Sequence, residues 1–238
     1  MEHFSDNREF DLYRDINTRT NGEIYIGVVG PVRTGKSTFI KRFMDLMVLP
    51  FMEDEHARER TIDELPQSAA GKTIMTTEPK FIPKEAVSVD LYGENQVKVR
   101  MIDCVGYIVQ EAEGIREEEN ERMVMTPWSK EPMPFSEAAE FGTRKVIHDH
   151  STLGIVVTTD GSFGEISREA YVPAEERTIQ ELKSIGKPFV VLLNTVKPFG
   201  EEAKELAQKL SEKYEVSVLP VNCNQLRNED IGRIMEQM

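Results

Sequence analysis

Short runs of apolar residues alternate along the chain with segments of helical periodicity. The apolar runs span residues 24–29, 153–159, 188–193 and 216–221. Continuous runs of this length are typical of parallel strands that are covered on both faces. Amphipathic or helix-favouring segments lie between and after these runs. They predict helices at about 36–47, 135–148, 174–185, 201–213 and 225–237.

A β-hairpin is predicted between the first two helices. Residues 86–91 and 96–102 flank the turn-forming sequence Tyr92-Gly93-Glu94-Asn95. Strands that alternate with helices imply right-handed crossovers and a mostly parallel sheet with helices on both faces. We therefore predict an α/β domain with six strands and five major helices, in which the hairpin contributes one antiparallel strand.

Three segments lack such a pattern. Residues 1–22 are polar, with a few apolar side chains near helical spacing, and predict an N-terminal arm or short helix before a domain at 23–238. Residues 51–79 are polar and are expected to be irregular. Residues 104–134 form a long acidic stretch with Gly and Pro, most of which we interpret as an insertion at 107–134.

The first apolar run leads directly into a phosphate-binding motif. The sequence GPVRTGKS at 30–37 matches G-x-x-x-x-G-K-[ST] at every fixed position, and it stands between a predicted strand and a predicted helix. Its glycines let backbone N–H groups approach phosphate oxygens, and the helix dipole favours the same anion. The residues expected to bind the nucleotide are Gly30, Pro31, Val32, Arg33, Thr34, Gly35, Lys36, Ser37 and Thr38. Within this set, Lys36 should reach the β- and γ-phosphates and Ser37 should ligate Mg²⁺.

A second motif lies at the end of the second hairpin segment. Asp103-Cys104-Val105-Gly106 matches the D-x-x-G pattern of GTPase-type enzymes. A carboxylate at the tip of a parallel strand lies in the crevice where open α/β sheets bind ligands. We predict that Asp103 holds Mg²⁺ and that the Gly106 N–H group meets the γ-phosphate. Together with the phosphate loop, this pattern predicts the Ras-like type of P-loop fold.

Two threonines are candidates for sensing the γ-phosphate. Thr76 and Thr77 stand just before the first hairpin strand, where GTPase-type domains present a threonine to Mg²⁺ and the γ-phosphate. The sequence does not decide which of the two would ligate the metal, and threonine is also common in ordinary turns.

The residues expected near the base favour adenine over guanine. Guanine-specific enzymes carry N-K-x-D after the corresponding strand, and its Asp accepts hydrogen bonds from the base. Here the segment is Asn194-Thr195-Val196-Lys197, so Asn194 remains but a cation without an acceptor replaces the Asp. A site that leaves the donors of guanine unpaired loses discrimination for that base. ATP is therefore the predicted nucleotide.

Hydrolysis by the isolated chain is expected to be slow. Many related enzymes place Gln directly after D-x-x-G to orient the attacking water, whereas this chain has Tyr107. The 107–134 segment or a neighbouring protomer would then supply the missing group. Arg33 is a further candidate for stabilising charge, and a surface ion pair is its alternative role.

Charge and cysteine content limit the partners and the compartment. The 238 residues carry a formal net charge of −13, which repels nucleic acid. Two cysteines exclude a disulfide framework and favour a reducing cytoplasm. The chain shows neither a signal-peptide pattern nor an apolar run long enough to cross a membrane.

Four segments closely resemble the stage IV sporulation protein A family. They read GPVRTGKSTFI at 30–40, DELPQSAAGKTIMTTEPKF at 63–81, DCVGY at 103–107 and AAEFGTRKVI at 138–147. The resemblance places the family's P-loop lysine on Lys36 and its Walker B aspartate on Asp103. It places the family's sensor threonines on Thr76 and Thr77.

The resemblance implies an ATPase of endospore-forming bacteria. ATP hydrolysis in that family drives self-assembly of a filament-like basement layer of the spore coat, in the mother-cell cytoplasm at the outer surface of the forespore. Implied partners are further copies of the chain, a small amphipathic membrane anchor and other coat proteins. Family members continue into further domains, so we expect this chain to be the ATPase domain alone. A GTPase-like regulatory switch and a structural protein with a vestigial nucleotide site are the alternatives.

Overall fold

A computed structural model describes most of the chain. The described residues are 23–66, 78–90, 96–109, 111–112, 116–117 and 120–238. The predicted arm at 1–22, the hairpin turn at 92–95 and the threonines Thr76 and Thr77 lie outside them. In the described part of the chain, no helix is both long enough and apolar enough to cross a membrane.

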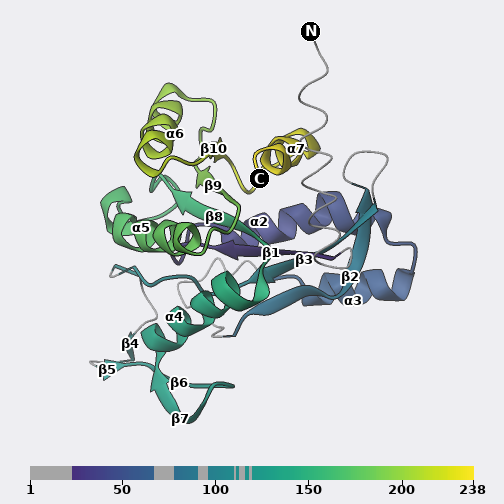
Figure 1. The fold of residues 1–238 in the computed structure, drawn as a ribbon, viewed down its shortest axis with the longest axis horizontal. Coiled ribbons are helices and arrows are strands. Elements are labelled where there is room, and N and C mark those ends of the chain that lie inside the picture. The colour runs from purple at the N-terminus through teal and green to yellow at the C-terminus, as the bar shows by residue number, and fades with distance from the viewer. Residues whose placement is uncertain (1–22, 67–77, 91–95, 110, 113–115, 118–119) are drawn as a thin grey trace.

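A six-stranded sheet forms the centre of the molecule (Figure 1). Its strands are β1 (Glu23–Val29), β2 (Lys80–Asp90), β3 (Gln96–Asp103), β8 (Leu153–Thr159), β9 (Phe189–Asn194) and β10 (Val218–Val221). They lie in the order β10-β9-β8-β1-β3-β2. All neighbours are parallel except β2, which pairs antiparallel with β3 at one edge. The prediction of six strands with one antiparallel member is therefore confirmed.

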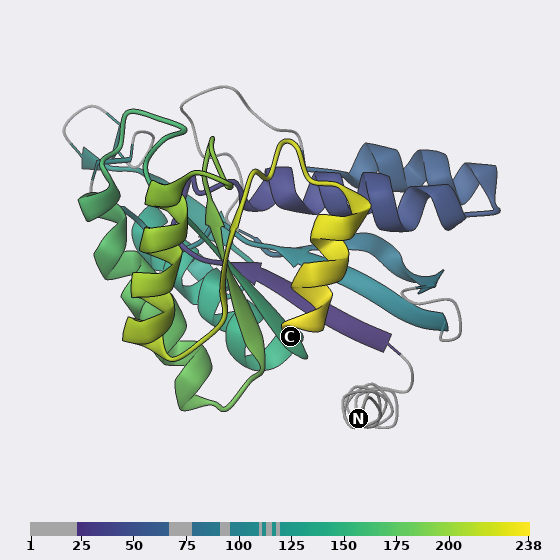
Figure 2. The same ribbon diagram turned by 90° about the horizontal axis from the view of Figure 1, so that it is seen from above.

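Helices cover both faces of this sheet (Figures 1 and 2). On one face lie α2 (Lys36–Phe43), which continues through a π turn (Met44–Val48), and α7 (Asn228–Glu236). On the other lie α4 (Phe135–Lys145) with its π turn (Val146–His150), α5 (Arg168–Ser184) and α6 (Glu201–Tyr214). The five predicted helices are present.

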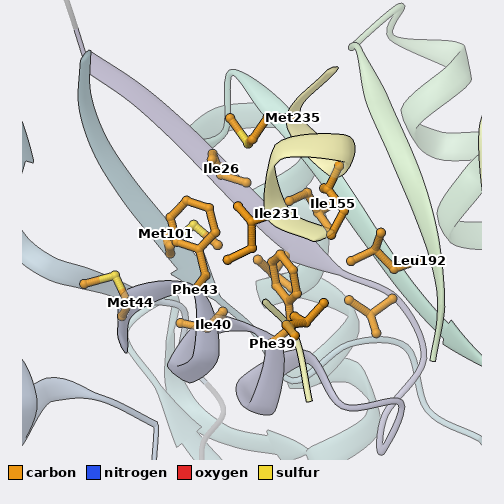
Figure 3. Close-up of a cluster of buried hydrophobic side chains, with 14 of the residues drawn as sticks. Ile26, Phe39, Ile40, Phe43, Met44, Met101, Ile155, Leu192, Ile231 and Met235 are labelled. Atoms are coloured by element: carbon orange, nitrogen blue, oxygen red, sulfur yellow. The ribbon is translucent and has the colours of Figure 1, made fainter. Parts of the chain in front are cut away.

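The period-two geometry of the strands divides the core between these layers. In β1, Ile24, Ile26 and Val28 face α2 and α7, whereas Val29 faces the opposite layer. The strands β8 and β9 alternate in the same way. Figure 3 shows the packing on the α2 side, where buried side chains from four strands interdigitate with those of α2, its π turn and α7. The labelled residues are Ile26, Phe39, Ile40, Phe43, Met44, Met101, Ile155, Leu192, Ile231 and Met235.

Two segments for which no helix or strand was predicted contain regular structure. Residues 51–79 include the helix α3 (Glu55–Glu64), which a short 3₁₀ turn (Leu49–Phe51) precedes. Asp54 caps this helix, because its carboxylate accepts hydrogen bonds from the N–H groups of His56 and Ala57 at 2.9 and 3.2 Å. The helix buries only Thr61, so it lacks the apolar stripe on which sequence prediction depends.

The acidic stretch before α4 also contains strands. A two-residue turn at Pro127 and Trp128 joins β6 (Met123–Thr126) to β7 (Ser129–Pro134) in an antiparallel hairpin. A smaller ribbon pairs β4 (Arg116–Glu117) with β5 (Asn120–Glu121). The β6–β7 hairpin lies at the end of α4 remote from the central sheet (Figure 1).

Candidate functional site

The phosphate loop joins β1 to α2. Gly30 and Gly35 have φ angles of 129° and 99°, which side chains rarely adopt. A Cβ atom at Gly30 would lie 2.4 Å from the carbonyl oxygen of Val157, so the loop tolerates only glycine there. Helix α2 begins at Lys36, directly after the loop. The first backbone N–H groups of α2 and its dipole therefore face the space that the loop encloses, as anion binding requires.

Lys36 is buried at the base of this loop. Its Nζ atom donates to the carbonyl oxygen of Pro31 at 2.5 Å and, more weakly, to that of Gly30 at 3.5 Å. Burial lowers the pKa of Lys36, and the nearby carboxylate of Asp103 opposes this effect. A buried ammonium group held by neutral carbonyls is well placed to gain from an incoming phosphate anion.

Ser37 and Asp103 meet across the first turn of α2. The Ser37 hydroxyl donates to Oδ2 of Asp103 at 2.9 Å, and Oδ1 of Asp103 is buried with no hydrogen-bond partner. Burial raises the pKa of Asp103, and the charge of Lys36 and the hydrogen bond from Ser37 act in the opposite direction. A hydroxyl oxygen and a carboxylate with one unpaired oxygen are ligands of the kind that Mg²⁺ prefers. These two residues therefore fit the predicted metal site.

Gly106 lies beside both Lys36 and helix α4. Its φ angle is 94°, and a Cβ atom there would lie 2.1 Å from the Gly30 carbonyl oxygen and 2.6 Å from Lys36 Nζ. Its N–H group donates to Oγ1 of Thr143 at 3.1 Å. The N–H group that we expected at the γ-phosphate is thus adjacent to the phosphate loop and is bonded to α4. Sequence reasoning assigned no role to Thr143, because no motif marks a threonine within an amphipathic helix.

Tyr107 is part of the framework of the loop. Its N–H group donates to the Gly30 carbonyl at 3.2 Å, and its carbonyl accepts from the N–H group of Val32 at 2.9 Å. Its side chain is buried, its hydroxyl donates to Glu181 on α5, and Arg177 lies 4.4 Å above the ring. The tyrosine therefore points into the α5 layer. This geometry agrees with the expectation that Tyr107 does not replace a water-orienting glutamine.

Asn194 links three elements of the site. Its Nδ2 atom donates to the Thr34 carbonyl in the phosphate loop at 2.9 Å, and its Oδ1 atom accepts from the N–H group of Cys223 at 3.0 Å. The amide thus fixes the loop against the end of β9 and the segment after β10. Lys197 is exposed at the same edge, where the guanine-reading carboxylate would stand. A contact between Asn194 and the base of a nucleotide remains a prediction.

Arg33 and the two cysteines have distinct surroundings. Arg33 is exposed, has a φ angle of 61° and lines a small pocket with Thr159 and Tyr171. Its role in charge stabilisation remains a prediction. Cys104 and Cys223 are buried free thiols, and burial raises their pKa values to about 11 and about 12. They are therefore protonated and unreactive at neutral pH.

The phosphate loop, the aspartate at the tip of β3 and the strand order together define a P-loop nucleoside triphosphatase of the GTPase-like type. The crystal structure of a variant of Era from Aquifex aeolicus, bound to GDP.AlF4-, has the same fold. It aligns with a TM-score of 0.50 over 91% of this chain and 57% of that chain, at 15% sequence identity. The α/β P-loop fold predicted from the sequence is confirmed.

Within this class the chain belongs to the stage IV sporulation protein A family. Residues 7–238 match the family model described as stage IV sporulation protein A, ATPase domain. The chain is 54% identical over 227 residues to stage IV sporulation protein A of Bacillus subtilis (strain 168). It is 57% identical over 226 residues to that of Clostridioides difficile (strain 630). The family resemblance inferred from the four segments is therefore confirmed.

The alignment covers most of this chain but less of its relatives. It includes 95% of the chain and 46% of the length of each of these two proteins. The chain thus spans about half the length of the relatives that it matches, and it corresponds to the ATPase domain of a sporulation protein.

Proposed function

We propose that the chain hydrolyses ATP to ADP and phosphate with Mg²⁺ as the metal ion, slowly when isolated. The convergence of Lys36, Ser37 and Asp103 around one glycine loop supports this proposal most directly. Lys36 would bind the β- and γ-phosphates, and Ser37 and Asp103 would hold the metal. When bound, Mg²⁺ neutralises charge that develops on the transferred phosphoryl group. Thr76 and Thr77 are proposed as the sensors of the γ-phosphate and as candidate metal ligands.

The proposed preference for ATP rests on the edge of the site near β9. The two polar atoms of the Asn194 amide bond to Thr34 and Cys223, so the amide itself is committed to the protein. Lys197 offers no acceptor for the two donors of guanine. A base without that donor pair loses nothing at this position, whereas guanine would find no protein acceptor there for its two donors.

The nucleotide cycle is proposed to drive self-assembly of the basement layer of the spore coat. The family membership supports this proposal. The proposed location is the mother-cell cytoplasm at the outer surface of the forespore. A small amphipathic membrane anchor and other coat proteins are the proposed partners. Because the relatives are about twice as long, regions beyond this domain are expected to contribute to assembly and docking.

The decisive experiment measures phosphate release from ATP and from GTP in the presence of Mg²⁺. Release should be faster with ATP, and chelation of Mg²⁺ should abolish it. Lys36→Ala is the control for contaminating hydrolases, because it removes the positive charge that would bind the phosphates and leaves the exposed surface almost unchanged. Equal or faster release from GTP contradicts the base preference. Absence of release from either nucleotide, with binding retained, would indicate a vestigial site.

A further inference from the structure

The hydrogen bond between Gly106 and Thr143 has a fixed polarity. Thr143 is fully buried on α4, and its hydroxyl donates to the carbonyl of Ala139 at 2.8 Å. The hydroxyl proton is therefore committed to the helix. Oγ1 can only accept from Gly106, whose N–H group it binds at 3.1 Å.

The same N–H group lies at the edge of the phosphate loop. Gly106 is so close to Lys36 that a Cβ atom would lie 2.6 Å from Nζ. Lys36 is the residue expected to bind the γ-phosphate, so a bound third phosphate would lie close to the residue whose N–H group now binds Thr143. A phosphate oxygen carries charge, and hydrogen bonds to charged acceptors are roughly twice as strong as those to neutral ones. One donor cannot satisfy both acceptors with good geometry.

We propose that Thr143 is a positioning residue that competes with the γ-phosphate for the Gly106 N–H group. The inference rests on the proposed function, because it requires ATP in the site. With ADP, the N–H group stays on Thr143 and links residue 106 to α4. With ATP, it turns to the γ-phosphate, and that link is released. Thr143 therefore lowers the affinity for ATP relative to ADP. It also couples binding of the third phosphate to the contact between residue 106 and α4.

The chain contains a built-in reporter of α4. Its single tryptophan, Trp128, lies in the turn of the β6–β7 hairpin. The indole ring packs on Phe141 of α4 with ring centroids 5.1 Å apart. Phe141 precedes Thr143 by two residues on the same helix. A change in α4 after the link is released should therefore alter the environment of Trp128 and its fluorescence.

The test compares binding of ADP and of a non-hydrolysable ATP analogue by titration calorimetry. In Thr143→Val the acceptor is lost in both the free and the ADP-bound forms, so the affinity for ADP should not change. In this variant the buried Gly106 N–H group has a partner only when the analogue is bound. The affinity of the variant for the analogue should therefore be about two- to tenfold higher than that of the wild type. Thr143→Ser keeps the hydroxyl and should retain the wild-type ratio of affinities. Thr143→Ala also removes the acceptor, with a smaller side chain, and should change the affinities as Thr143→Val does.

A matched control is available on α5. Thr178 is also fully buried, and its hydroxyl donates to the carbonyl of Ala174 at 2.8 Å, in the same geometry as Thr143. Thr178→Val should leave the ratio of affinities unchanged. Circular dichroism then verifies that each variant is folded. A wild-type ratio in folded Thr143→Val and Thr143→Ala would overturn the inference.

Fluorescence of Trp128 gives a second readout that does not depend on hydrolysis. In the wild type, the ATP analogue and ADP should give different emission, because only the analogue releases Gly106 from Thr143. In Thr143→Val the link is absent in every state, so this difference should be lost. Identical emission with both ligands in the wild type would also overturn the inference, while leaving the proposed ATPase intact. Absence of binding by both ligands would instead overturn the proposed function, and the inference with it.

Discussion

At the scale of single residues, a substitution at Asp103 should affect hydrolysis and nucleotide binding to different extents. Asp103→Asn keeps the size of the side chain and the acceptor for the Ser37 hydroxyl, but it removes the charge that would hold Mg²⁺. Hydrolysis should therefore fall far more than nucleotide binding measured without Mg²⁺. Phosphate release and calorimetry on the same protein test this expectation. An equal loss in both measurements would show that Asp103 supports the loop rather than the metal.

Substitution of the paired threonines should affect hydrolysis, whereas substitution of Lys36 should affect nucleotide binding. A sensor acts only when the γ-phosphate is present, so Thr76→Ala combined with Thr77→Ala should leave nucleotide binding near its wild-type value and stop hydrolysis. Lys36→Ala should weaken binding itself, by about 1.5–3 kcal/mol for a lost charge-assisted hydrogen bond. Binding titrations and phosphate release distinguish the two effects. Normal hydrolysis by the double variant would refute the sensor assignment.

At the scale of elements, a buried carboxylate joins β8, α5 and α6. Glu175 on α5 is fully buried and bonds to Arg168 at 2.7 Å and to the Tyr214 hydroxyl at 2.8 Å, and it also accepts from Thr158. Burial and the nearby carboxylate raise the pKa of Tyr214, so its hydroxyl stays a donor. Loss of one partner leaves a buried charge uncompensated.

Substitutions in this cluster should therefore affect stability strongly. Glu175→Ala should lower the free energy of unfolding by about 3–5 kcal/mol, and Tyr214→Phe by about 1.5–3 kcal/mol. Glu176→Ala is the matched control, because Glu176 also joins α5 to α6, through Lys213, but at the surface. It should cost less than about 1 kcal/mol. Urea unfolding measures all three, and equal effects at Glu175 and Glu176 would contradict the argument.

Elements with a strong pattern were predicted closely, and those stabilised by tertiary contacts were not. The run at 153–159 coincides with β8, because a strand buried on both faces must be apolar throughout. Helix α5 begins at Arg168, six residues before the predicted start and before Pro173. The buried Tyr171 and the pair of Arg168 with Glu175 stabilise this first part of the helix. Neither contact is visible in local sequence.

The site follows the same division. The positions of residues 30–37 and Asp103 could be predicted because each belongs to a local motif at the end of a strand. Thr143 was missed because its contact with Gly106 depends on the tertiary position of α4, which no local motif marks. Thr76 and Thr77 lie outside the described residues, so their assignment rests on the sequence alone.

At the scale of the whole molecule, the source of the group that orients the attacking water is still a prediction: either the 107–134 segment or a neighbouring copy would supply it. Tyr107 faces α5 and not the phosphate loop, so no glutamine-like group follows Gly106. An arginine supplied by a neighbour accelerates phosphoryl transfer by roughly 10³–10⁵ in related enzymes. If assembly supplies such a group, turnover per molecule should rise with protein concentration, and more steeply in a full-length relative. Phosphate release measures turnover, and light scattering of the same samples measures assembly. Constant turnover during visible assembly would show that each copy is catalytically complete.

The pair of hydrogen bonds between Tyr107 and the phosphate loop also has a dynamic consequence. Because Val32 and Tyr107 donate across one small bridge, their amide protons become accessible only when the bridge opens as a unit. Hydrogen–deuterium exchange should therefore be slow at both positions and at similar rates. A nucleotide should slow both further, because it stabilises the loop. Residues 32 and 107 would thus open and close together, and independent exchange at the two amides would contradict this expectation.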